Sequence, residues 1–199
     1  QPGATPNTEP DGDDAVPKIE LDGSLMADRD PEVFASSVGL YVTTSGAEIR
    51  GLVVNRFARA QIMLRGGGAH TIDGNFLGTD VTGMHARGAR WYGIEARGSK
   101  QNLIGGQTPA ARNVVSGNVQ AGVAITDEQA TGNVVQGNFI GPDRTGKAAL
   151  PDARCEGVLI SGEVGRDRYP TANLVGGNTA AARNVISGNG WAGGEIYGG

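Results

Sequence analysis

The stretch NLIGGQTPAARNVVSGNVQAGVAI at residues 102–125 returns at residues 173–196 as NLVGGNTAAARNVISGNGWAGGEI. The two copies are identical at two thirds of their positions. A second pair, HTIDGNFLGTDVTG from residue 70 and NVVQGNFIGPDRTG from residue 133, is identical at half of its positions. Self-similarity at such regular spacings is the signature of stacked supersecondary units, so these repeats decide the fold.

The composition does not suit an ordinary globular core. Glycine accounts for 34 of the 199 residues and aromatic residues for 5%, far from the usual balance of a packed domain. No segment holds an apolar period of 3.6 residues, because glycine or asparagine interrupts each short apolar run. The single cysteine, Cys155, rules out a disulfide within the chain. What remains is a set of many short strands that are stabilised by stacking.

The order of the motifs predicts how these strands stack. Each repeat enters through the same asparagine and apolar motif, so equivalent strands should run parallel, at about 4.8 Å per coil. Parallel connections are right-handed in nearly all cases. We therefore predict an all-β fold, a right-handed, single-stranded parallel β-helix of about six coils. Period-two alternation points the following residues into its core: Val115, Val123, Ile125, Val135, Val158, Ile160, Val175 and Ile186.

Asparagine recurs at fixed places in the repeats, and we predict a structural role for it. Asparagine tolerates left-handed backbone conformations, and a glycine beside it permits a sharp turn. Four asparagines are expected at corners: Asn75, Asn118, Asn138 and Asn189. Five more are expected to begin strands: Asn102, Asn113, Asn133, Asn173 and Asn184. We also expect stacked asparagine side chains to bond along a ladder, in preference to contacting a ligand.

The chain divides into an irregular lead-in, residues 1–16, and the β-helix, residues 17–199. The lead-in is rich in Pro, Gly, Asn and Asp, a composition that disfavours regular structure. The formal net charge is −4, but residues 1–32 hold nine acidic and two basic side chains. We interpret the lead-in as a solvated acidic arm.

Two groups of acidic residues are candidate cation ligands. Asp80 and Asp143 occupy equivalent places in the second pair of repeats, in TDVTG and PDRTG. An Asp followed by Thr and Gly is typical of a turn in which the carboxylate accepts backbone N–H groups, and because the motif recurs we favour this role over calcium binding. Asp11, Asp13 and Asp14 lack the full spacing of a calcium loop. We expect no cofactor, with calcium as the alternative.

The segment MHARGARWY, residues 84–92, is the candidate ligand-binding site. The later copy, KAALPDARC from residue 147, has a small neutral AAL at this place. The simpler interpretation is a solvated loop whose tryptophan covers the edge of a coil. The functional interpretation is contact with an acidic polysaccharide, because guanidinium groups bind carboxylates or sulfates and aromatic faces stack on sugar rings. The residues that would make this contact are His85, Arg87, Arg90, Trp91 and Tyr92.

No constellation of residues identifies a catalytic site. Lyase chemistry needs a base beside a group that neutralises a uronate, and hydrolysis needs two carboxylates at a fixed separation. Spacing singles out no pair among the candidates: Asp80, Asp143, Asp152, Arg87, Arg90, Arg144 and Arg154. Arg112 and Arg183 recur at identical repeat positions, so we interpret them as turn-binding residues. Catalytic residues stay unassigned, and a role other than catalysis is favoured.

These motifs together resemble the parallel β-helix repeat proteins of the pectin-lyase-like superfamily. More narrowly, the QPGA start, the IGG and RNVISGN stretches and the GNFIG repeats resemble long bacterial surface proteins with a CSLREX-type N-terminal region. The resemblance spans nearly the whole chain and implies export, an extracellular or cell-surface location, and a protein that continues beyond both ends of this sequence. Polysaccharide lyases, hydrolases and epimerases share this fold, but one fold hosts many functions.

We therefore expect an extracellular β-helix rod that acts as a spacer or adhesive module with glycan contacts. The alternative is a polysaccharide lyase or epimerase that acts on a uronate polymer. Nucleic acid is disfavoured as a partner because the chain is acidic and lacks a long basic face. No apolar run approaches the ~18 residues that span a bilayer. The coil begun at Ile196 offers an unpaired strand, so end-to-end self-association is expected.

Overall fold

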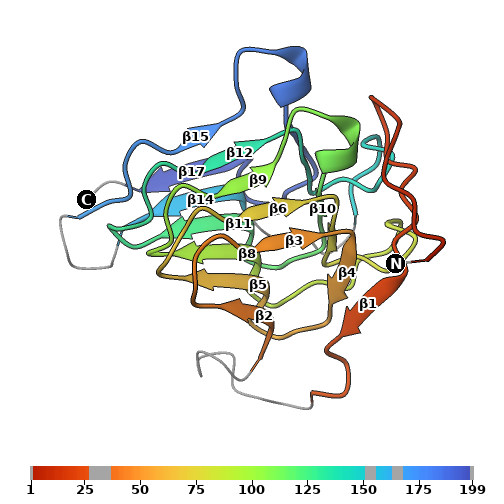
Figure 1. Cartoon of the computed structure of the whole chain (residues 1–199), viewed down its shortest axis with the longest axis horizontal. Helices are drawn as coiled ribbons and strands as arrows, with labels where there is room; N and C mark the ends of the chain where they lie inside the picture. Colours follow the sequence, from red (N-terminus) through yellow and green to blue (C-terminus); the bar gives the residue numbers. More distant parts are fainter. Residues whose placement is uncertain (1, 27–36, 151–155, 163–167, 198–199) are drawn as a thin grey trace.

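A computed structural model describes residues 2–26, 37–150, 156–162 and 168–197. It confirms the predicted parallel β-helix of about six coils, in which the chain passes through three sheets in turn (Figure 1). Within these residues the structure contains strands and two short 3-10 turns and no α-helix. None of the described residues form a helix of the length and apolarity needed to cross a membrane.

Each sheet collects one strand from successive coils, and every neighbouring pair is parallel. Sheet I contains β1 (Ile19–Asp22), β4 (Leu52–Asn55), β7 (Phe76–Leu77), β10 (Val114–Val115), β13 (Phe139–Ile140) and β16 (Val185–Ile186). Sheet II contains β2 (Val38–Val42), β5 (Ala60–Arg65), β8 (Tyr92–Arg97), β11 (Ala121–Thr126), β14 (Glu156–Ser161) and β17 (Gly194–Tyr197). Sheet III contains β3 (Glu48–Arg50), β6 (Thr71–Asp73), β9 (Leu103–Gly105), β12 (Val134–Gln136) and β15 (Leu174–Val175).

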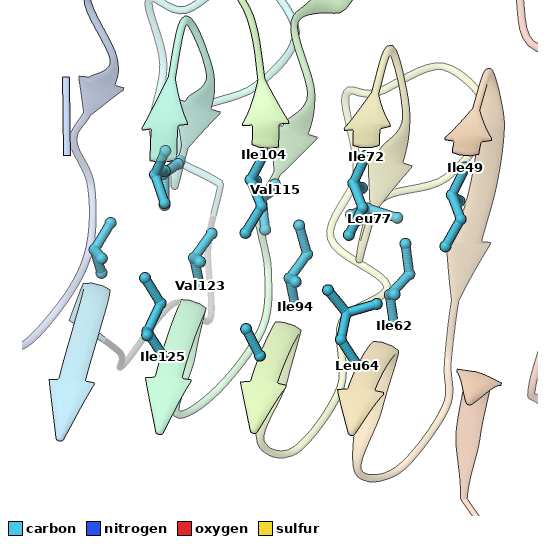
Figure 2. Packing of buried hydrophobic residues seen from close by; sticks show 14 of the residues in the cluster. Ile49, Ile62, Leu64, Ile72, Leu77, Ile94, Ile104, Val115, Val123 and Ile125 are labelled. Atoms are coloured by element: carbon cyan, nitrogen blue, oxygen red, sulfur yellow. The ribbon is translucent and has the colours of Figure 1, made fainter. Parts of the chain in front are cut away.

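The core is a set of aliphatic rows that run along the axis of the coils. β-Branched residues fit a pleated surface and pack on their own kind in the next coil, as in the sheet III row Ile49, Ile72 and Ile104 (Figure 2). Val135 continues this row in the next coil. The residues predicted to point inward on β10, β11, β12 and β14 are all buried in this core. Ile186 is half-buried against it. Val175 is 38% exposed, because β15 is the last described strand of its sheet.

The repeating unit of the sequence is two coils rather than one. The copies at residues 102–125 and 173–196 form the coils β9 to β11 and β15 to β17, with the coil β12 to β14 between them. In the two similar coils the long loop follows sheet III and contains a 3-10 turn, η1 (Pro109–Ala111) or η2 (Ala180–Ala182). In the alternate coils the long loop follows sheet I. This alternation explains why strong identity skips one coil before it reappears.

Asparagine forms two ladders, and the predicted distinction between corner and strand-start asparagines is wrong for one of them. Asn75 and Asn138 lie in the same ladder as Asn113 and Asn184, with side-chain hydrogen bonds of 3.1, 2.9 and 3.2 Å between successive members. The left-handed conformation belongs to the preceding glycine, as at Gly137 (φ 71°), and no described asparagine adopts it. A glycine there has no side chain to clash, so the turns before Asn75 and Asn138 need no left-handed asparagine.

The second ladder continues through Asn102, Asn133 and Asn173. The Asn102 Nδ2 donates to Asn133 Oδ1 at 2.7 Å, and the Asn133 Nδ2 donates to Asn173 Oδ1 at 3.0 Å. These side chains are expected to stabilise the stack because they satisfy buried polar groups that the coil turns leave unpaired. The predicted ladder of stacked asparagines is therefore confirmed.

The lead-in packs against the coils, so the predicted solvated arm is only partly confirmed: Glu9, Asp11 and Asp14 are exposed, but the segment is not free of the β-helix. Residues 2–16, red in Figure 1, run beside the stack instead of extending from it. Ala15 packs against Val53, Phe76 and Val114 on the outer face of sheet I. The Asp13 side chain is only 1% exposed. An acidic composition favours solvation only where no surface receives the segment, and this β-helix supplies such a surface.

Candidate functional site

The predicted cation ligands Asp80 and Asp143 hold turns, which is the role we favoured for them. Asp80 Oδ1 accepts hydrogen bonds from the hydroxyl and backbone N–H of Thr82 at 2.6 and 3.2 Å. Asp143 Oδ1 accepts the equivalent bonds from Thr145 at 2.6 and 3.0 Å. Burial raises the pKa of Asp80, but hydrogen bonds from Thr82 and the following backbone outweigh it and leave that pKa below its usual value. Both loops are therefore closed by their own carboxylates.

The basic aromatic segment divides between a loop and a sheet. His85, Arg87 and Arg90 are at least partly exposed in the connection from β7 to β8. The Arg87 guanidinium donates to the neighbouring carbonyl of Ala86 at 2.8 Å. Tyr92, in contrast, is the first residue of β8 and is buried. The structure therefore does not gather the three loop residues and the aromatic pair around one hollow.

Trp91 and Tyr92 adjoin a buried ion pair on the outer face of sheet II. The Arg59 guanidinium binds both carboxylate oxygens of Glu95, with its Nη2 at 3.1 Å from each, and both side chains are only 2% exposed. The Arg59 guanidinium also lies over the Trp91 ring, 4.6 Å from its centroid. Trp91 and Tyr92 meet edge to face with ring centroids 6.0 Å apart. The pair locks the aromatic side chains in place, because a desolvated cation over an indole is held firmly.

A cavity of about 200 Å³ opens beside this cluster. Arg97, Thr126 and Ser161 line it from neighbouring strands, at the same register position of β8, β11 and β14. The Arg97 side chain is 28% exposed, and its Nη1 lies 3.9 Å from Glu95 Oε1. Thr126 Oγ1 is buried and has no hydrogen-bond partner within the described part of the chain. The cavity thus offers an indole and a guanidinium, while the Thr126 hydroxyl oxygen lies beneath its surface.

The ionisable groups of the cluster are tuned for binding more than for proton transfer. Burial raises the pKa of Glu95, although the Arg59 and Arg97 guanidinium groups oppose the shift. Burial also raises the pKa of Tyr92 to about 12, with the Glu95 carboxylate adding to the effect. Tyr92 is therefore a neutral phenol at any physiological pH. Glu95 has both oxygens engaged by Arg59, so neither faces an incoming substrate freely.

Sequence reasoning identified Trp91 and Tyr92 and missed Arg59, Glu95 and Arg97. Charged residues at outward positions of a strand are common, so the alternation in YGIEAR does not distinguish Glu95, and Arg59 lies before the strand AQIMLR. The pairing register of the strands would have indicated Arg59. Ala60 pairs with Tyr92, so the residue before β5 necessarily lies opposite the residue before β8, which places Arg59 against Trp91.

The other catalytic candidates do not converge on this cavity. Arg144 and Arg112 bind the lead-in, and Asp152 and Arg154 lie outside the described residues. Among the residues that the structure describes, no three His, Cys, Asp or Glu side chains are placed to hold a metal ion. Glu95 and Asp127 are thus the carboxylates that the fold places beside the hollow lined by Arg59 and Arg97.

Comparison with known proteins identifies no relative, since no family model, no curated protein and no solved structure matches this chain. The parallel β-helix therefore rests on the geometry of the three sheets. The narrower family resemblance stays a prediction from the repeats.

Proposed function

We propose that this chain is a β-helix stem of an exported bacterial surface protein, which acts as a spacer or adhesive module and contacts glycans. The repeated coils and the resemblance of the repeats to surface proteins with a CSLREX-type region support the first part. The cavity on the outer face of sheet II supports the second. The single observation that carries glycan contact is the juxtaposition of the Trp91 indole and the Arg97 guanidinium around one hollow.

Each of these groups matches one feature of an acidic sugar. An aromatic ring covers the apolar face of a pyranose, and a guanidinium forms charge-assisted hydrogen bonds with a carboxylate or sulfate. Arg59 fixes the indole from behind, so the ring is held in place before binding. The ligand class is therefore an acidic polysaccharide.

The geometry favours binding over lyase or epimerase chemistry. A base must lie within hydrogen-bond reach of the proton that it removes. Glu95 is 2% exposed and is bound by Arg59 through both oxygens. Asp80 and Asp143, the other predicted carboxylates, are engaged in their own turns. Asp127 also lines the cavity and is half-buried, so a lyase or epimerase would have to use this carboxylate as its base, and no second carboxylate free of such contacts lines the cavity among the described residues.

Calorimetric titration with alginate, polygalacturonate and a sulfated glycan tests the proposal. We expect heat with at least one of them at low salt, and weaker binding at physiological salt, because exposed charges are screened over about 8 Å there. Arg97→Ala should weaken binding about tenfold, the equivalent of about 1.4 kcal/mol, and flatten the salt response. Trp91→Ala should weaken binding with little change in the salt response.

Arg90→Ala is the matched control, because Arg90 is an exposed arginine beside Trp91 that does not line the cavity. Unchanged binding in this variant places the ligand on sheet II. Loss in Arg90→Ala and Arg87→Ala, with Arg97→Ala unaffected, would place it on the loop instead. Absence of heat with all three polymers at low salt would contradict the proposal that this chain binds acidic polysaccharide.

A further inference from the structure

The outer face of sheet I carries an apolar row that the lead-in only partly covers. Register places Val53, Phe76, Val114, Phe139 and Val185 in one line along the axis. Ala15 covers the first three of them. Val185, at the other end of the row, is half-buried. The lead-in therefore behaves as a peptide bound along a groove, and the groove extends further than this peptide.

Two arginines hold the lead-in through its main chain. Arg112 Nη2 donates to the carbonyl of Pro10 at 2.7 Å, and its Nη1 donates to the carbonyls of Glu9, at 3.0 Å, and of Gly12. The guanidinium stacks on Phe139, 4.3 Å from the ring centroid. The interpretation of Arg112 as turn-binding is therefore too narrow, because what it captures is a segment far away in the chain.

Arg144 repeats this arrangement one coil away. Its Nη2 donates to the carbonyl of Ala15 at 2.8 Å, its Nε donates to the carbonyl of Asp13, and its guanidinium lies 5.3 Å from the centre of the Phe76 ring. Recognition of carbonyls requires an extended backbone that is not using them in a strand or helix. Such recognition depends only weakly on which side chains the bound segment carries. Both arginines thus use one chemistry for one kind of ligand.

The last coil presents the same elements again. Arg183 occupies the place of Arg112, after η2 instead of η1, and its side chain is 68% exposed with its Nη2 3.7 Å from Asp11. Between the two 3-10 turns lies a cavity of about 400 Å³, with Phe139 and Val185 among its lining residues. Pro10 and Asp11 of the lead-in form part of its wall, so the cavity is continuous with the interface that the lead-in already occupies.

We propose that this cavity is a second peptide-docking site, which takes an extended acidic segment of a partner polypeptide. The Arg183 guanidinium donates hydrogen bonds to main-chain carbonyls of that segment, as Arg112 donates to those of residues 9, 10 and 12. Val185, which is half-buried, accepts a small apolar side chain, as Val53 and Phe76 accept Ala15, whereas Phe139 is already covered by Arg112 and is only 3% exposed. The acidic character of the partner follows from charge complementarity, because two guanidinium groups, those of Arg112 and Arg183, line the cavity against one carboxylate, that of Asp11.

A free peptide with the lead-in sequence TPNTEPDGDDAV tests this site in the full chain. The peptide carries a fluorophore, and its anisotropy is followed as protein is added. We expect saturable binding that Arg183→Ala weakens at least tenfold, because hydrogen bonds to a charged group contribute that factor or more. Arg168→Ala is the matched control, since Arg168 is an equally exposed arginine that pairs with Glu128 and lies outside the cavity. The Arg168→Ala variant should bind the peptide with the same affinity as the unaltered protein.

Four outcomes would overturn the proposal. The first is absence of saturable binding, and the second is equal binding of a scrambled peptide of the same composition. The third is unchanged affinity in Arg183→Ala, which would mean that the peptide displaces the protein's own lead-in. The fourth is concentration-dependent dimerisation that Arg183→Ala abolishes, since this would assign the cavity to a second copy of the chain. Equal melting temperatures of the two arginine variants verify that folding is unaffected.

Discussion

His70 takes the place of an asparagine in the ladder that continues through Asn102. The His70 backbone N–H donates to Asn102 Oδ1 at 3.1 Å, as the N–H of Asn102 donates to Asn133 in the next coil. The imidazole Nδ1 accepts the N–H of Ala47 at 3.0 Å, and Nε2 is buried without a hydrogen-bond partner in the described structure. A titratable ring therefore stands where the repeat has a neutral amide.

The imidazole should make the coils around it sensitive to acid. Burial lowers the pKa of His70 below its usual 6.5, with the Thr44 backbone opposing the shift. The unfolded chain therefore binds the proton first, and the free energy of unfolding should fall as pH drops below about 6.5. His70→Asn should remove this component, because an asparagine Oδ1 accepts the equivalent N–H of Leu52 in the first ladder. Denaturant unfolding between pH 7 and pH 5 measures the difference. Parallel pH curves for the two proteins would contradict it.

Introducing a carboxylate should cost very different amounts of stability at two equivalent positions of sheet III. Val135 and Val175 pair in register, but Val135 is fully buried while Val175 is 38% exposed. Val135→Asp should cost several kcal/mol and unfold neighbouring coils together, because an unpaired charge is costly in an apolar core and each coil depends on those beside it. Val175→Asp should cost under about 1 kcal/mol, as surface substitutions do. Thermal unfolding of both variants measures this, and equal melting temperatures would disprove the assigned burial.

The stacking of the coils was predictable because it depends on side chains that repeat. Val and Ile at alternating positions, and asparagine at fixed intervals, are visible in the sequence and dictate parallel rows. The period of the repeats was equally visible, in the distance from residue 102 to residue 173 and from residue 70 to residue 133. That each period contains two coils was less visible, because the two kinds of coil differ in whether the long loop follows sheet III or sheet I.

The docking of the lead-in could not be predicted, because main-chain carbonyls make most of its contacts. Such atoms are the same in every residue, so the contact between Arg112 and Pro10 leaves no pattern in the sequence. The cavity on sheet II was half predictable. Trp91 was predictable as a site residue because it departs from the later copy of its repeat. Glu95 was not, because it occupies an ordinary outward position whose burial depends on the surrounding fold.

Asp13 should loosen the lead-in as pH rises. Its Oδ1 accepts the Ala15 N–H at 2.9 Å and lies 3.7 Å from Arg144 Nη2, but its Oδ2 is buried with no hydrogen-bond partner among the described residues. Burial raises the pKa of Asp13 from 3.8 to about 6, although the hydrogen bond from Ala15 and the charges of Arg144 and Arg112 oppose the shift and Asp14 adds to it. The folded state thus holds a proton that the unfolded state has released.

The free energy of unfolding should therefore fall between about pH 4 and pH 6 and then level off, by up to about 3 kcal/mol from a shift of about two pKa units. Asp13→Asn keeps an oxygen for the Ala15 N–H and removes the charge. It should lose this component and be the more stable protein at pH 7. Glu9→Gln serves as the control, because Glu9 is an exposed carboxylate of the same segment. Comparing denaturant unfolding of the variants across this pH range isolates the effect. A stability difference between Asp13→Asn and the unaltered protein that does not change with pH would show that the buried carboxyl stays ionised.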